Sequence, residues 1–85
     1  MPTILVADDD ANIRELVCLF LRNDGFATAE AADGKEALAV YSSTNVDLVV
    51  LDIMMPIMDG WTLSKEIRRA HPDLPLIMLT ARGET

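Results

Sequence analysis

Short apolar runs alternate along this chain with segments whose apolar residues recur at the spacing of a helix. The runs at residues 4–7, 48–51 and 76–79 are brief and uninterrupted, which is typical of strands buried on both faces of a parallel sheet. Strands that alternate with helices over such short distances indicate βαβ units. We therefore predict an α/β fold with a doubly wound parallel sheet.

The expected boundaries follow from these patterns and from residues that begin or end helices. Asp10 is suited to cap the start of the first helix, and Gly25 is suited to end it. Residues 26–30 lack large side chains, so we expect them to form a weak strand near an edge of the sheet. In chain order we expect strands at residues 4–7, 26–30, 47–52 and 76–79, with helices between Asp10 and Gly25, from residue 33 to about 43, and at 61–70.

Length and charge exclude several classes of protein. The chain has 85 residues, which is enough for one domain and too few for two. Acidic residues outnumber basic ones 14 to 7, so we expect no direct contact with nucleic acid and no binding to an anionic membrane. The single cysteine, Cys18, fits a reducing compartment. No signal-peptide pattern or membrane-length apolar run is present, so we expect a cytoplasmic location.

Polar side chains stand where three of the predicted strands end. Asp8 and Asp9 follow the first strand, Asp52 ends the third, and Thr80 follows the fourth. Open parallel sheets bind ligands beyond the carboxyl ends of their strands, at the point where the strand order reverses. If the first and third strands are neighbours, three carboxylates converge there beside a hydroxyl group.

Such a cluster is costly unless it binds a cation. Two carboxylates about 5 Å apart repel each other by roughly 3 kcal/mol at an effective dielectric constant of about 20. Mg²⁺ would relieve this repulsion, and a carboxylate beside it could attack phosphorus to form an aspartyl phosphate. The simpler interpretation is that Asp8, Asp9 and Asp10 cap a helix while Asp52 begins a loop. That interpretation suits Asp10, but it leaves the joint placement of the other acids unexplained.

Four motifs in order resemble the receiver domains of two-component response regulators over nearly the whole chain: ILVADDD at residues 4–10, DLVVLDIMMP at 47–56, DG at 59–60 and LTA at 79–81. The resemblance implies a flavodoxin-like fold in which Asp52 accepts a phosphoryl group from a sensor histidine kinase. It also implies that Asp8, Asp9, Asp52 and the backbone carbonyl of Met54 hold Mg²⁺. Thr80 would be the hydroxyl that moves toward the phosphoryl group.

The resemblance also has limits along the chain. Receivers carry a lysine on a fifth strand and end in a further helix, and neither is present here; Lys35 and Lys65 fall on predicted helices. We therefore expect residues 1–85 to be a receiver domain that is incomplete at its C-terminus, with dimers or exchanged elements forming along the unpaired fourth strand. LTARGE at residues 79–84 most resembles receivers that precede a winged-helix DNA-binding domain, which implies control of transcription.

Two alternatives to a signalling module stay open. As a signalling module the chain is a substrate of its kinase and not an enzyme. An aspartyl-phosphate hydrolase would place a second acid two residues beyond the nucleophile, and Met54 occupies that position. An assembly module or inert fragment would keep the fold without being able to switch.

Overall fold

A computed structural model describes residues 2–52, 60–70 and 72–79. In chain order these residues form β1 (Thr3–Ala7), α1 (Ala11–Asn23), β2 (Ala27–Ala31), α2 (Gly34–Ser43), β3 (Leu48–Asp52), α3 (Gly60–Ala70) and β4 (Leu76–Leu79). The predicted order of strands and helices is confirmed. None of the helices within these ranges is both long enough and apolar enough to cross a membrane.

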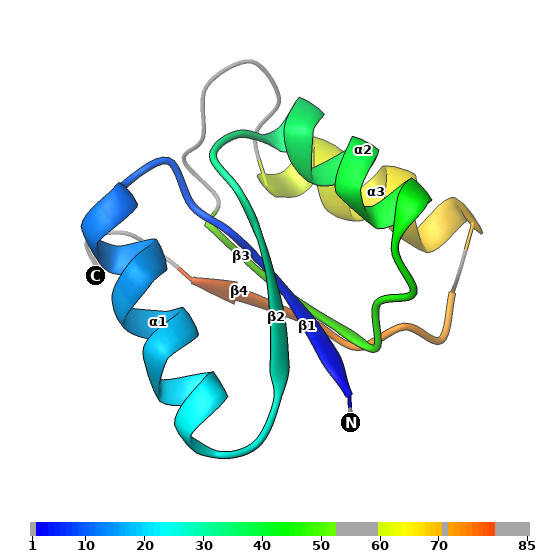
Figure 1. Cartoon of the computed structure of the whole chain (residues 1–85). Coiled ribbons are helices and arrows are strands. Elements are labelled where there is room, and N and C mark those ends of the chain that lie inside the picture. The colour runs from blue at the N-terminus through cyan, green and yellow to red at the C-terminus, as the bar shows by residue number, and fades with distance from the viewer. Residues whose placement is uncertain (1, 53–59, 71, 80–85) are drawn as a thin grey trace.

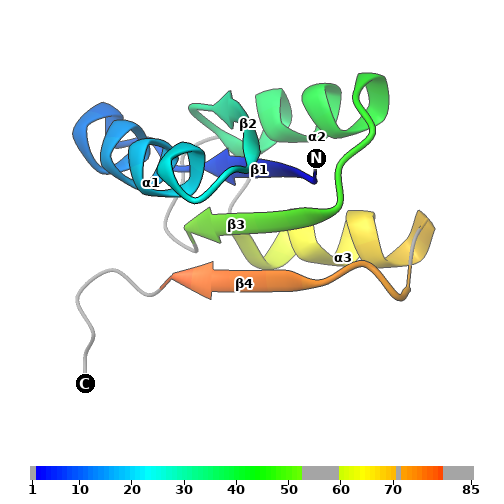
Figure 2. The same cartoon turned by 60° about the horizontal axis from the view of Figure 1, so that its bottom comes forward.

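The four strands form one parallel sheet in the order β2-β1-β3-β4. Figure 1 shows α1 on one face of this sheet and α2 and α3 on the other. Figure 2 shows β1, β3 and β4 lying side by side. The chain first builds outward from β1 to β2 and then crosses to the other side of β1 to place β3. This doubly wound, flavodoxin-like arrangement makes the boundary between β1 and β3 the point where the strand order reverses.

Both central strands are buried on both faces, which explains their uninterrupted apolar sequences. On β1, Leu5 and Ala7 pack into a core with α2 and α3, whereas Ile4 and Val6 pack toward Cys18 of α1. The side chains of β3 divide between the same two cores. β2 lies at an edge of the described sheet, as its weak sequence predicted.

The apolar stripe of α1 is wider than the surface that it buries. Val17, Cys18 and Leu21 pack against the sheet, with Cys18 fully buried. The apolar residues at helical spacing that predict this helix also include Leu16 and Phe20, whose exposed fractions are 53% and 63%. An amphipathic pattern therefore located the helix correctly but did not show how much of its apolar face would be covered.

Local sequence also fixes where α1 ends and α2 begins. Gly25 has a φ angle of +94°, a conformation that residues with a Cβ atom rarely adopt, so it ends α1 as predicted. At the start of α2, the Asp33 carboxylate accepts a hydrogen bond from the Glu36 amide, and the Glu36 carboxylate accepts one from the Ala32 amide. This variant of the capping box, in which Glu36 reaches the residue before the N-cap, directs the chain from β2 into α2.

Candidate metal site at the carboxyl edge of the sheet

The pairing of β1 with β3 brings acids from two distant parts of the sequence to one edge of the sheet. Ala7 pairs with Leu51 in the parallel register, Asp8 comes next after β1, and Asp52 is the last residue of β3. The two carboxylates therefore start from neighbouring positions at the carboxyl ends of adjacent strands. This edge is where the reversal of strand order predicts a ligand site.

Three of the predicted site residues lie together. Asp8, Asp9 and Asp52 each offer a carboxylate oxygen, and these oxygens all lie within 4.8 Å of one another. Asp8 and Asp52 are buried, with exposed fractions of 4% and 8%, whereas Asp9 is exposed. The other two predicted site residues, Met54 and Thr80, lie outside the described residues.

The environment of Asp8 disfavours its charged form. Burial raises the pKa of Asp8, and the negative charges of Asp52, Asp9 and Asp10 raise it further. A hydrogen bond from the Asp10 amide acts in the opposite direction and lowers the pKa. Two ionised carboxylates about 5 Å apart repel each other by roughly 3 kcal/mol at an effective dielectric constant of about 20, so the buried Asp8 and Asp52 oppose each other's charge. A bound cation would convert this repulsion into attraction.

The turn between β1 and α1 holds Asp8 by its main chain and its carboxylate. The Asp8 amide donates to the Ala31 carbonyl at 3.1 Å, and Asp8 Oδ1 accepts from the Asp10 amide at 2.9 Å. The Asp10 carboxylate accepts from the amides of Asn12 and Ile13, at 2.9 and 3.3 Å. Asp10 is thus the N-cap of α1, as predicted from its position before the helix.

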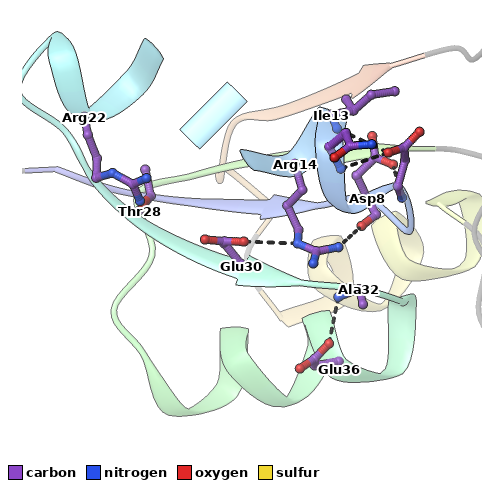
Figure 3. Close-up of polar contacts among 10 residues, drawn as sticks. Asp8, Ile13, Arg14, Arg22, Thr28, Glu30, Ala32 and Glu36 are labelled. Carbon is purple, nitrogen blue, oxygen red and sulfur yellow. Dashed lines mark hydrogen bonds and ion pairs between the residues drawn. The ribbon is translucent and has the colours of Figure 1, made fainter. Parts of the chain in front are cut away.

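Arg14 makes a contact with the Asp8 main chain that the sequence does not predict. Its Nη1 donates to the Asp8 carbonyl at 2.7 Å, while its Nε donates to Glu30 Oε1 on β2 at 3.1 Å (Figure 3). Helical spacing places Arg14 between the apolar residues of α1, which is also what a solvated surface residue looks like. Helical spacing does not show in which direction a long arginine side chain points. No feature of the sequence could therefore have identified this contact.

The donor set at this edge fits a hard divalent cation. Carboxylate oxygens are ligands that Mg²⁺ accepts, and Mg²⁺ commonly binds one or two carboxylates together with water. Two of the three acids are buried near like charges, so a cation would relieve an electrostatic cost that the fold already contains. The residues present therefore fit Mg²⁺ on chemical grounds.

A separate hollow lies between the C-terminal ends of α2 and α3, with Tyr41, Asn45 and Leu74 in its lining. It is at the edge of the sheet where β3 and β4 begin, opposite the acids. Ligands of open parallel sheets bind at the carboxyl ends of the strands, so we place the candidate site at the acids.

The response regulator receiver domain family matches residues 4–85. The chain belongs to this family. Among curated relatives, it is 44% identical over 81 residues to the regulatory protein VanRc of Enterococcus gallinarum, covering 95% of this chain and 35% of that protein. It is 46% identical over 81 residues to the transcriptional regulatory protein ResD of Bacillus subtilis, covering 95% of this chain and 33% of ResD. The receiver chain thus spans about a third of the length of these relatives.

Solved receiver structures share the fold closely. The response regulator TrrA of Thermotoga maritima, in complex with Mg²⁺-BeF, has a TM-score of 0.93 and 44% identity, covering 98% of this chain and 72% of TrrA. TrrA in complex with the histidine kinase ThkA has a TM-score of 0.91 and 44% identity, covering 99% of this chain and 72% of that chain. These likenesses establish the flavodoxin-like receiver fold predicted from the sequence.

Proposed function

We propose that this receiver is a phosphoacceptor module in which Asp52 takes a phosphoryl group from a sensor histidine kinase. The observation that carries the proposal is the convergence of Asp8, Asp9 and Asp52 where the strand order reverses. Asp52 is the one of the three that ends a central strand, so the sheet holds its backbone in place. The Thermotoga relative that is 44% identical forms a complex with a histidine kinase, which supports the choice of partner.

In the proposed phosphoryl transfer, each acid would help to bind the metal ion, and Asp52 would also be the nucleophile. Asp8, Asp9 and Asp52 would hold Mg²⁺, together with the backbone carbonyl of Met54 that the family resemblance implies. When bound, the cation neutralises negative charge on the phosphoryl group. An oxygen of Asp52 attacks the phosphorus, a new P–O bond forms, and the P–N bond to the kinase histidine breaks with its electron pair leaving on the imidazole. The Thr80 hydroxyl would donate a hydrogen bond to a phosphoryl oxygen.

The proposal also covers which residues form the receiver domain and what process the whole protein controls. We propose that residues 1–85 form a receiver domain and that the whole protein controls transcription through a winged-helix domain. The names of relatives such as ResD, a transcriptional regulatory protein, support this output. The net charge of −7 would repel DNA phosphates, which supports the proposal that the winged-helix domain binds DNA and that this segment makes no direct contact with it.

We propose that the chain accepts a phosphoryl group without turning over as an enzyme. The relatives named above are regulators, and Met54 occupies the position where an aspartyl-phosphate hydrolase would carry its second acid. We further propose that copies of this chain associate along β4. This strand lies at an edge of the described sheet, and such edges offer hydrogen-bonding groups to a second strand.

Incubation with acetyl phosphate and Mg²⁺, followed by intact mass measurement, tests the phosphoacceptor role. We expect a lasting gain of one phosphoryl group, because Asp52 lies beside two acids that can hold the cation. Asp52→Asn should abolish the gain, since an amide oxygen is a poor nucleophile. Asp47→Asn is the matched control, because Asp47 is an exposed acid just before the opposite end of the same strand.

The other outcomes separate the alternatives. Rapid consumption of acetyl phosphate with no lasting mass gain would support a hydrolase. An unchanged mass under conditions where the chain is folded would support the inert fragment or assembly module. A gain that persists in Asp52→Asn would place the acceptor at another residue and overturn the proposed role of Asp52.

A further inference from the structure

We propose that Arg14 is a positioning residue for the carboxylate site: by fixing the main chain of Asp8, it sets the geometry in which the acids bind a divalent cation. The inference rests on the proposed function of Asp8, Asp9 and Asp52 as the metal site. It concerns a residue on α1 that offers no ligand to the metal.

Arg14 connects three separate segments of the chain. Its backbone lies in the first turn of α1, where the Arg14 amide donates to the Asp10 carbonyl at 2.9 Å. Its guanidinium reaches the Asp8 carbonyl at 2.7 Å and the Glu30 carboxylate on β2 at 3.1 Å. Figure 3 shows the guanidinium lying between Asp8 and Glu30. Only 18% of the Arg14 side chain is exposed, compared with 40% for Glu30.

These contacts restrict the direction in which the Asp8 side chain points. Asp8 is the first residue beyond β1, so its peptide orientation is not set by the strand ladder alone. Its amide is held by the Ala31 carbonyl, its carbonyl by Arg14, and one carboxylate oxygen by the Asp10 amide. The bond from Arg14 has a charged donor and is the shortest of the three, at 2.7 Å, so it restrains the Asp8 carbonyl strongly. Loss of this bond would free the Asp8 peptide to rotate and the carboxylate to move with it.

The positive charge of Arg14 should weaken Mg²⁺ binding, whereas its hydrogen bond to the Asp8 carbonyl should strengthen it. A guanidinium near a cation site repels the cation, and the ion pair with Glu30 offsets this repulsion only in part. Replacing Arg14 with a neutral side chain should therefore tighten Mg²⁺ binding if charge alone matters. It should weaken Mg²⁺ binding if Arg14 orients Asp8. The sign of the change in affinity distinguishes the two effects.

The test is calorimetric titration of MgCl₂ into the wild-type chain, Arg14→Met and Arg22→Met. Arg22 is the matched control, because it lies on the same helix and its Nη1 donates at 2.9 Å to the Thr28 hydroxyl, also on β2. Arg14→Met should bind Mg²⁺ about tenfold more weakly, at the lower end of the losses found when partners of metal ligands are removed. Arg22→Met should bind like the wild type.

Equal or tighter Mg²⁺ binding by Arg14→Met overturns the inference while leaving the metal site intact. A drop in the metal-free melting temperature with an unchanged Mg²⁺ dissociation constant would assign Arg14 a purely structural role and overturns it as well. Absence of Mg²⁺ binding by the wild-type chain overturns both this inference and the metal site. The two failures are thus distinguishable.

Arg14→Lys keeps the test available if Arg14→Met does not fold. Lysine retains the positive charge and the apolar stem, but it lacks the planar fork that contacts the Asp8 carbonyl and Glu30 together. Because the charge is unchanged, any loss of affinity reports geometry. We expect about threefold weaker Mg²⁺ binding, intermediate between wild type and Arg14→Met. Wild-type affinity in Arg14→Lys overturns the inference.

Discussion

Asp8 is a buried carboxylate whose ionisation the fold opposes. Its pKa is raised by burial first and by the charges of Asp52, Asp9 and Asp10 next, above the ordinary value of 3.8. A carboxyl group with a raised pKa in the folded state binds protons more tightly when folded, so stability falls as pH rises from the unfolded pKa through the folded pKa. The destabilisation is absent below about pH 3.8 and complete above the raised pKa.

Asp8→Asn should therefore stabilise the metal-free chain at pH 7, by on the order of 1 kcal/mol in the free energy of unfolding. The gain should vanish at pH 3, where Asp8 is protonated in both states. Millimolar Mg²⁺ should raise the melting temperature of the wild type and leave that of Asp8→Asn nearly unchanged. Urea unfolding at both pH values measures the effect, with Asp73→Asn, at an exposed acid in the turn before β4, as control. An equal gain at pH 3 and pH 7 would contradict the electrostatic origin.

At the scale of elements, the turn from β1 to α1 contains two acids, Asp8 and Asp10, that have different structural roles. Asp8 lies in the carboxylate cluster, whereas the Asp10 side chain caps α1 through two main-chain amides. The bond from the Asp10 amide to Asp8 uses the backbone, so it does not require the Asp10 carboxylate. Replacing the Asp10 side chain should therefore separate helix stability from metal binding.

We expect Asp10→Ala to lower the free energy of unfolding by about 1 kcal/mol, the usual cost of losing an N-cap side chain. Its Mg²⁺ affinity should change by less than about threefold, because the lost charge is exposed and screened. Denaturant unfolding and Mg²⁺ titration measure the two quantities. Asp33→Ala, which removes the cap of α2, is the comparison. Loss of Mg²⁺ binding in Asp10→Ala alone would identify Asp10 as a ligand.

Sequence predicted those features that depend on neighbours along the chain. The apolar strands ending in Asp8 and Asp52 and the cap at Asp10 each follow from a local pattern, and the rule for parallel sheets then brings the acids together. The contact of Arg14 could not be predicted, because it depends on how a side chain bends toward a strand that lies 16 positions away in the sequence. The exposure of Phe20 depends on how whole helices and strands pack, so it could not be predicted from a local pattern either.

At the scale of the whole molecule, large apolar side chains are exposed on α1 and on the face of the sheet that α1 covers. Ile77 of β4 pairs in register with Val50, which packs toward Cys18 of α1, so Ile77 faces the same way. It is 48% exposed, and Phe20 on α1 is 63% exposed. Apolar surface of this kind favours association, whereas a net charge of −7 opposes it through repulsion between copies.

These opposing terms predict dimers that form at high protein concentration and strengthen with added NaCl, because salt screens the repulsion and does not weaken the burial of apolar surface. Ile77→Thr and Phe20→Gln should each weaken the dimer, and Ile77→Thr should do so while keeping the β-branched shape that suits a strand. Ala39→Gln is the control, because Ala39 is exposed on α2, across the sheet from α1. Light scattering over a concentration series measures the mass. A monomer at every concentration and salt level would remove β4 as an association edge, and dimers unaffected by Ile77→Thr and Phe20→Gln would place the contact elsewhere on the molecule.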